Sequence, residues 1–332
     1  MTLRMPPEWA KHSRTWVAFP TAGYTLGDTK VEHEAARKTW AAVANAASEF
    51  EAVSVVVNPG DEGIAKKYLS SQIEIVPIPI NDAWIRDSGP TFVTDGKEIK
   101  AVDWVFNGWG AQGWATYDLD SRLAGSIAQH LGVEVVSSDL VNEGGGFHVD
   151  DTGRVLLTET VQLGKGRNPK SSKQEVEAEF QEKLGAVNAI WLKRGLTRDY
   201  EEFGTQGHVD IVACFAPDGR VLYHDQKNPN HPDFMVSTEV RETFIRQGIE
   251  VVSIPAPEVL KDSEGFVDYS YINHYVLNNA VLLCAFDDPS DKEAKALLRE
   301  VYPGREIVLL DARELFARGG GIHCITQQQP AF

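Results

Sequence analysis

A strand, strand, helix, strand pattern of roughly 60 residues recurs along this chain, and a repeat of that kind limits the architectures that the chain can form. Each copy begins with two short apolar runs joined by a turn, and the turns contain Asp95-Gly96, Thr152-Gly153, Asp218-Gly219 and Asn278-Asn279. A stretch with helical periodicity follows each hairpin, and another short apolar run ends the copy. The pattern therefore predicts an α/β protein built from ββαβ units.

Four complete copies can be placed. The predicted hairpins span residues 90–102, 147–160, 208–224 and 272–286. The predicted helices span residues 121–131, 174–184, 236–247 and 292–301, and the closing strands span residues 133–136, 189–192, 251–254 and 307–310. Glycines fall near the helix ends, where a left-handed cap favours them: Gly132, Gly185, Gly248 and Gly304.

A fifth copy is split between the two ends of the chain. Its first strand is predicted at residues 322–326, its second at 15–19, its helix at 31–48 and its last strand at 53–57. Pairing of the two ends closes the five units into a ring, which removes exposed sheet edges. The alternative is an open α/β sheet with hairpin insertions. Because no linker or change of composition interrupts the chain, we expect one domain over residues 1–332.

Composition restricts the possible partners. The formal net charge of −16 argues against nucleic acid and anionic membranes, and it favours the approach of a small cation, although solubility alone also explains it. The three cysteines have no paired spacing, which fits a reducing compartment better than a disulfide framework. No signal peptide is recognisable and no apolar run reaches about 18 residues. We expect a cytoplasmic protein; its oligomeric state cannot be read from the sequence.

Unusual polar residues recur at one place in the repeat, in or just before the first strand of a unit. They are Asp87, Glu143, His208, Asp210 and Cys324. In a ring, equivalent positions converge on the axis, so we expect these side chains to meet. The segments around Glu143 and Cys324 even read alike, since Gly-Gly-Gly-Phe-His resembles Gly-Gly-Gly-Ile-His.

His208 and Asp210 lie two apart on a predicted strand, so their side chains should share a face, either as a buried ion pair or as part of a site. Cys324 follows three glycines, and a thiol becomes nucleophilic as a thiolate beside a protonated imidazole. Adjacent strand residues face opposite ways, which favours His208 over His323 as its partner. Cys214 and Cys284 lie in apolar runs and are predicted to be core residues.

These residue types allow several kinds of site. Zinc binding is disfavoured because no Cys-x-x-Cys or His-Glu-x-x-His spacing is present, and no phosphate-binding loop is recognisable. A protease-like Cys-His-Asp arrangement leaves Asp87 and Glu143 without a role. A planar guanidinium explains all of the residues, because carboxylates accept its paired N–H groups while the thiol attacks its carbon. We therefore expect a hydrolase for a small guanidine compound, with no metal and no cofactor.

At these residues the chain resembles the agmatine deiminases, in the bacterial peptidylarginine-deiminase-type branch of the guanidine-modifying superfamily. The similarity covers nearly the whole chain. The matching motifs are Met5-Pro6-Pro7-Glu8-Trp9, Thr15-Trp16-Val17-Ala18-Phe19-Pro20, Asn81-Asp82-Ala83-Trp84-Ile85-Arg86-Asp87-Ser88-Gly89-Pro90, Phe106-Asn107-Gly108-Trp109-Gly110, Glu143-Gly144-Gly145, Arg167-Asn168-Pro169, Gly207-His208-Val209-Asp210 and Gly319-Gly320-Gly321-Ile322-His323-Cys324-Ile325-Thr326-Gln327-Gln328.

The resemblance implies a five-bladed ββαβ propeller, the pentein fold, and a role for each matched residue. Cys324 would be the nucleophile, His208 the general acid and base, and Asp87 and Asp210 the guanidinium clamps. Glu143 would orient guanidinium and imidazole, and Trp84 and Trp109 would bind the substrate. The implied course passes through an S-alkylthiouronium on Cys324 and ends with ammonia and a ureido product.

The chain also departs from the family pattern. Agmatine deiminases commonly have Gly-Lys-Tyr where this chain has Gln112-Gly113-Trp114 after Ala111, and an acidic residue where it has Gln206. Those segments border the mouth of the site in the family. Agmatine is our first choice of substrate, followed by another alkylguanidine. An amidinotransferase and a non-catalytic propeller that binds a partner are the remaining alternatives.

Overall fold

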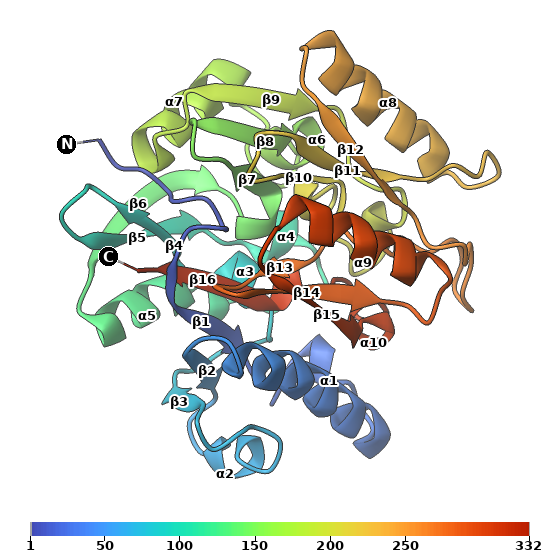
Figure 1. Cartoon of the computed structure of the whole chain (residues 1–332). Helices are drawn as coiled ribbons and strands as arrows, with labels where there is room; N and C mark the ends of the chain where they lie inside the picture. Colours follow the sequence, from blue (N-terminus) through green and yellow to red (C-terminus); the bar gives the residue numbers. More distant parts are fainter. Residues whose placement is uncertain (1, 332) are drawn as a thin grey trace.

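Five small sheets organise the computed structural model, which describes residues 2–331 (Figure 1). Four of the sheets have three strands, with the first two antiparallel and the last two parallel. They contain β4 (Thr91–Thr94), β5 (Ile99–Val105) and β6 (Glu134–Val141); β7 (Phe147–Val149), β8 (Arg154–Thr158) and β9 (Asn188–Leu192); β10 (Ala213–Phe215), β11 (Val221–Asp225) and β12 (Val251–Pro255); and β13 (Tyr275–Val276), β14 (Ala280–Ala285) and β15 (Glu306–Asp311). Each sheet is one predicted copy of the repeat.

The fifth sheet combines the two ends of the chain. Its order is β16 (Thr326–Pro330), β1 (His12–Ala18), β2 (Val53–Val57) and β3 (Glu74–Pro77). Figure 1 shows the red β16 beside the blue β1, and these strands pair antiparallel, as the split copy predicts. The strand predicted at residues 322–326 was misplaced, because residues 323–325 form a helical turn before β16. Within the described residues the strands form separate sheets, none of which closes on itself.

Long helices connect the parallel strands of each sheet. They are α1 (Lys30–Ser48), α5 (Leu123–Leu131), α7 (Lys173–Leu184), α8 (Asp233–Arg246) and α9 (Ser290–Val301). Thr29 caps α1 and Ser172 caps α7, each in a reciprocal capping box with a glutamate three residues on. Gly132 and Gly185 adopt the left-handed conformation after α5 and α7. Gly304 does not cap α9, which ends at Val301 with Tyr302 as its C-cap residue, and it belongs to the following turn.

A continuous hydrophobic core joins these sheets. Its larger cluster contains residues of all five sheets, including Trp16, Phe92, Leu156, Phe215 and Tyr275. A smaller cluster surrounds Phe147 and Phe180. Cys214 and Cys284 lie buried in β10 and β14, which confirms their prediction as core cysteines. No helix of the described chain is long and apolar enough to cross a membrane.

A short turn precedes the first strand of every sheet. These turns are α3 (Ile85–Ser88), the 3₁₀ turns η3 (Gly144–Gly146), η5 (Val209–Ile211) and η6 (His323–Ile325), and a bend ending at Asn273 before β13. The residues singled out in the sequence lie in or beside these turns, and not in strands. A 3₁₀ turn rotates by about 120° per residue, so strand alternation does not hold for His208 and Asp210. His208 and Asp210 therefore do not lie on a strand as predicted, although both side chains reach the same point beside Gly145.

Candidate active site

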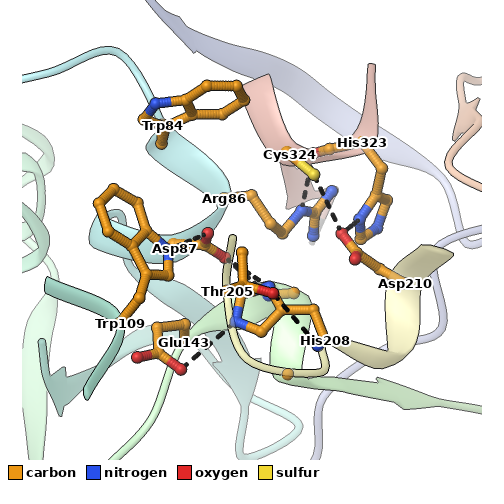
Figure 2. A network of polar contacts seen from close by, with 12 residues as sticks. Trp84, Arg86, Asp87, Trp109, Glu143, Thr205, His208, Asp210, His323 and Cys324 are labelled. Atoms are coloured by element: carbon orange, nitrogen blue, oxygen red, sulfur yellow. Dashed lines mark hydrogen bonds and ion pairs between the residues drawn. The ribbon is translucent and has the colours of Figure 1, made fainter. Parts of the chain in front are cut away.

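The turns bring all the candidate side chains into one buried cluster (Figure 2). They lie in or beside the turns that precede four different sheets, and each is at most 4% exposed: Asp87, Glu143, His208, Asp210 and Cys324. Trp84 and Trp109 border the same cluster and are each 5% exposed. The convergence expected from the repeat is therefore present, and it places a thiol, an imidazole and three carboxyl groups together.

Asp87 is fixed by two donors at the end of α3. Its Oδ2 accepts a hydrogen bond from Trp109 Nε1 at 2.8 Å, and its Oδ1 accepts one from the backbone N–H of Gly145 at 3.0 Å. Trp109 reaches this position from α4 (Gly108–Ala111), where its own backbone is left-handed with φ 56°. Burial raises the pKa of Asp87 although the neighbouring His208 opposes that shift. Asp87 is therefore held in place and becomes harder to ionise.

Glu143 and His208 form the second part of the cluster. Arg167 Nε lies 2.9 Å from both carboxylate oxygens of Glu143, and Glu143 Oε2 lies 3.4 Å from His208 Nε2. His208 Nδ1 lies 3.8 Å from Asp87 Oδ1. Burial by itself would lower the pKa of His208, but the surrounding carboxylates outweigh it and raise that pKa to about 9. His208 is therefore a cation at neutral pH.

The loop before His208 is held by a buried carboxylate that the sequence analysis missed. Asp199 accepts hydrogen bonds from the backbone N–H groups of Thr205, Gly207 and His208 at 2.6, 2.6 and 3.0 Å. Gln206 and Gly207 both have positive φ in this loop. Since the bonds to Asp199 oppose that strain, they fix the direction in which the imidazole points.

Cys324 contacts Asp210 and Asn273, and not His208 as predicted. Its Sγ donates to Asp210 Oδ2 at 3.4 Å and accepts from Asn273 Nδ2 at 3.3 Å. The prediction of a direct His208 contact assumed a strand at Cys324, where the chain forms η6 instead. Burial raises the pKa of the Cys324 thiol well above its usual range, and the charges of Asp210 and Asp87 add to the shift. The thiol is therefore protonated in this arrangement.

His323, next to Cys324 in the chain, contacts Asp210 and Glu8. Its Nδ1 lies 2.8 Å from Asp210 Oδ2, and its Nε2 lies 2.7 Å from Glu8 Oε1. Although burial opposes it, His323 holds the pKa of Asp210 below its usual range. Glu8, Asn273, Arg167 and Asp199 are the site residues that sequence reasoning did not identify. Glu8 and Arg167 do stand in motifs of the family, which was the one available signal.

Two glycines leave room between the functional groups. A Cβ atom on Gly145 would lie 2.5 Å from His208 Nδ1, 3.0 Å from Asp210 Oδ2 and 3.0 Å from Asp87 Oδ1. One on Gly320 would lie 2.7 Å from Trp84 Cζ3 and 3.0 Å from Cys324 Sγ. Both positions therefore require the bare backbone. His208 Nδ1, which borders the Gly145 position, and Asp210 Oδ1 are both buried without a hydrogen-bond partner, so two polar atoms of the cluster are unsatisfied.

The segments that depart from the family pattern form one network beside Trp109. Trp114 stacks on Trp109 with ring centroids 5.3 Å apart, and it donates from Nε1 to Gln112 Oε1 at 3.1 Å. Gln206 Nε2 lies 3.4 Å from the same oxygen, and Gln112 Nε2 donates to the carbonyl of Gly204 at 2.6 Å. The two glutamines and Trp114 thus occupy the border of the site with neutral groups.

The donor set suits a planar cation. In the part of the chain that the structure describes, no group of three or more His, Cys, Asp and Glu side chains is arranged to hold a metal ion. Carboxylates on two sides and a nucleophilic thiol on a third can hold a guanidinium and attack its carbon. A cationic imidazole at the same space can protonate a departing amine.

Comparison with known proteins agrees with that chemistry. The sequence profile of the Porphyromonas-type peptidyl-arginine deiminases matches residues 4–330. A Streptomyces coelicolor protein whose provisional name is agmatine deiminase is 53% identical over 99% of both chains. The agmatine deiminase of Ectopseudomonas mendocina is 37% identical over 98% of this chain and 95% of its own. Among solved structures, the agmatine deiminase of Enterococcus faecalis superposes with a TM-score of 0.90 at 31% identity, covering 99% of this chain and 96% of that one.

Proposed function

Because the chain belongs to the Porphyromonas-type peptidyl-arginine deiminase family, we propose that it hydrolyses agmatine to N-carbamoylputrescine and ammonia. The observation that carries this proposal is the convergence of Asp87, His208 and Asp210 on one point beside Gly145. Two carboxylates there match the N–H groups of a guanidinium, and a thiol stands next to one of them. The net charge of −16 favours the approach of a cation over that of nucleic acid.

In the proposed reaction, Cys324 attacks as a thiolate. The bound cation lowers the pKa of the neighbouring thiol, because an adjacent positive charge stabilises the anion. The sulfur adds to the guanidinium carbon, and protonated His208 transfers its proton to one nitrogen. Ammonia then leaves, so that the carbon remains bound to Cys324 as an S-alkylthiouronium and His208 is neutral.

Hydrolysis of that intermediate completes the proposed cycle. Neutral His208 takes a proton from water, and the oxygen adds to the thiouronium carbon. The C–S bond breaks, which returns the Cys324 thiolate and protonated His208 and leaves a ureido group on the substrate. The remaining proton and the released ammonia make ammonium, so atoms and charge balance. Glu143 orients His208 throughout, and Asp87 and Asp210 hold the cation.

Trp84 and Trp109 are proposed to shape the substrate side of the site. The Trp84 ring faces Cys324 across Gly320, and its apolar surface suits an alkyl chain leading away from the guanidinium. Trp109 acts through Asp87, to which it donates.

We also propose that the five sheets are the blades of a ring and that residues 1–332 form one domain. The pairing of β16 with β1 and the core cluster that contains residues of all five sheets support this arrangement. The three free cysteines favour a reducing compartment, and we place the protein in the cytoplasm on that ground.

Assays with agmatine and with a monocationic alkylguanidine of equal chain length test the proposed function. Agmatine should give ammonia and N-carbamoylputrescine in equal amounts. If the terminal amine is recognised, kcat/KM for agmatine should exceed that for the monocation about tenfold, since one charge-assisted contact contributes about 1.5 to 3 kcal/mol. Equal rates would refute agmatine as the preferred substrate, and no ureido product from either compound would refute the reaction.

A further inference from the structure

A buried row of four titratable side chains leads from the protein interior to the proposed nucleophile. Glu8 Oε1 lies 2.7 Å from His323 Nε2, His323 Nδ1 lies 2.8 Å from Asp210 Oδ2, and that same oxygen lies 3.4 Å from Cys324 Sγ. Each of the four residues is at most 5% exposed. Figure 2 shows His323, Asp210 and Cys324 converging in this order. The imidazole therefore lies between two carboxylates and away from solvent.

The contacts of His323 define its protonation state. Ionised carboxylates only accept hydrogen bonds, so both ring nitrogens must carry a proton to satisfy both neighbours. Burial and the nearby Arg86 guanidinium would lower the pKa of His323, but Glu8 and Asp210 outweigh them and the pKa is raised. His323 is therefore an imidazolium, and its positive charge lies directly against Asp210.

A comparison of Asp210 with Asp87 shows how the charge of His323 affects the pKa of a neighbouring carboxyl group. Both carboxylates are buried and both border the point beside Gly145. His208 acts electrostatically on both, yet the pKa of Asp87 is raised by burial, whereas that of Asp210 is lowered against burial. The largest opposing contribution at Asp210 is the hydrogen bond and charge of His323, with a smaller one from Arg86, whereas Asp87 has no such contact and is raised further by Asp210 and Glu143. Without the positive charge of His323, the two buried carboxylates would repel each other. One of them would then take up a proton and become neutral.

We propose that His323 and Glu8 are positioning residues, which act on the substrate only through Asp210. Charged His323 keeps Asp210 ionised by donating to its Oδ2, and Glu8 keeps His323 charged. Ionised Asp210 then faces the guanidinium with Oδ2, the oxygen that borders the point beside Gly145, while its Oδ1 is buried without a partner. This role rests on the proposed guanidine hydrolysis. It gives a function to the histidine next to Cys324, which strand alternation disfavours as the partner of the thiol.

Other charged or titratable groups also face this row. Those around Glu8 and His323 are Arg86, His148 and His274, and those around Asp210 are Asp87, His208, Arg86 and Cys324. Arg86 lies 3.4 Å from Glu8 and donates from Nε to the carbonyl of His323 at 3.2 Å. Because Arg86 remains in place when His323 is replaced, Glu8 keeps one ionic partner.

The pH profile of the variant His323→Asn tests the proposal. The asparagine amide nitrogen takes the position of Nδ1 and still donates to Asp210, but the positive charge is lost. The acid limb of kcat/KM should move to higher pH by about one to two units, with activity above that limb within about threefold of the parent. Glu8→Gln, which weakens the charge on His323, should move the limb in the same direction by less.

A buried histidine outside the row provides the matched control. His274 contacts the Tyr271 carbonyl and the Tyr302 hydroxyl, and burial lowers its pKa to about 4, so it is neutral. His274→Asn should lower stability and leave the acid limb in place. If His323→Asn loses the same factor at every pH with an unmoved limb, His323 is only structural and the proposal is overturned. If His323→Asn does not fold, Glu8→Gln decides instead, and an acid limb that stays in place in Glu8→Gln overturns the proposal.

A measurement without substrate separates this proposal from the proposed function. Nitrogen-15 NMR of histidine-labelled free protein at pH 7.5 should show both nitrogens of His323 protonated, with the signal assigned by its absence in His323→Asn. A neutral His323 would overturn the proposal even if agmatine is hydrolysed. If His323 is charged but the protein hydrolyses no guanidine, the proposed hydrolysis is overturned, while the proposed charges of Glu8, His323 and Asp210 are still supported.

Discussion

Arg167 Nε bonds to both carboxylate oxygens of Glu143, each at 2.9 Å, and so fixes the carboxylate that faces His208. Arg167 is itself held by donation from Nη2 to the carbonyl of Thr205 at 2.7 Å, in the loop that leads to His208. Burial would raise the pKa of Glu143, but Arg167 and His208 outweigh it and lower that pKa. Glu143 therefore stays ionised and helps to keep the imidazole charged.

The charge of His208 makes stability depend on pH. Its pKa is about 9 in the folded protein against an ordinary value of 6.5, so the folded state binds the proton more tightly. The resulting stabilisation is fully present below about pH 6.5 and is lost as pH rises through about 9. His208→Asn removes it. Urea unfolding should show that the parent exceeds this variant by up to about 3 kcal/mol more at pH 6 than at pH 9.5. An equal difference at both pH values would mean that His208 is neutral.

Removing the negative charge of either guanidinium clamp should slow the reaction. Asp87→Asn and Asp210→Asn keep the shape of the side chain but lose a charge-assisted contact. We expect kcat/KM to fall roughly 30- to 1000-fold, which corresponds to about 2 to 4 kcal/mol of transition-state stabilisation. Steady-state kinetics with agmatine measure this loss. Reductions below about threefold in both variants would assign the carboxylates a structural role only.

Covalent labelling should single out Cys324 among the three cysteines. A haloamidine resembles a guanidinium and carries a leaving group, so its carbon should bind where the carboxylates direct it. Mass spectrometry of peptides should place the label on Cys324, and Cys324→Ser should fold but lack activity. Cys214 and Cys284 serve as internal controls, because they lie in strands β10 and β14, whereas Cys324 Sγ lies 3.4 Å from Asp210 Oδ2, a proposed guanidinium ligand. Labelling chiefly at either of them would contradict the assignment of the nucleophile.

The uncharged residues at the border of the site should weaken binding of the terminal amine of agmatine, which is its second positive charge. Gln206 lies 3.4 Å from Gln112 in a network without a carboxylate. Gln206→Asp restores the acidic residue common in agmatine deiminases, and it should raise the preference for agmatine over a monocationic alkylguanidine about tenfold. Gln206→Asn is the matched neutral control and should leave the preference unchanged. An unchanged ratio in Gln206→Asp would place the distal end of the substrate elsewhere.

Local chemistry allowed most of the elements to be predicted. Turn residues, helical periodicity and glycines near helix ends act over a few residues, so the hairpins and the five long helices lie within a few residues of their predicted places. The candidate residues could be found because titratable side chains interrupt apolar runs at one position of the repeat. The family motifs then assigned each of them a role.

The local conformation of the site could not be predicted in the same way. The turns at η5 and η6 follow glycine-rich segments with weak preferences, and packing against other sheets decides their shape. Reasoning from strand alternation therefore gave the wrong backbone conformation at His208 and Asp210 and the wrong partner for Cys324. Contacts with Asp199, in the preceding loop, orient His208, and contacts with Asn273, from another sheet, hold the Cys324 thiol.

The sequence by itself determined the repeat, its split fifth copy and the candidate residues Cys324, Asp87, Glu143 and Asp210, because these depend on residue type and short-range spacing. Only the tertiary structure decided which of the buried side chains are charged. Glu8 and His323 lie 315 residues apart in the chain, yet they meet at 2.7 Å because β16 pairs with β1. The protonation of a buried group depends on the groups around it in space. Whether Asp210 is ionised and Cys324 is protonated is therefore a property of the folded chain.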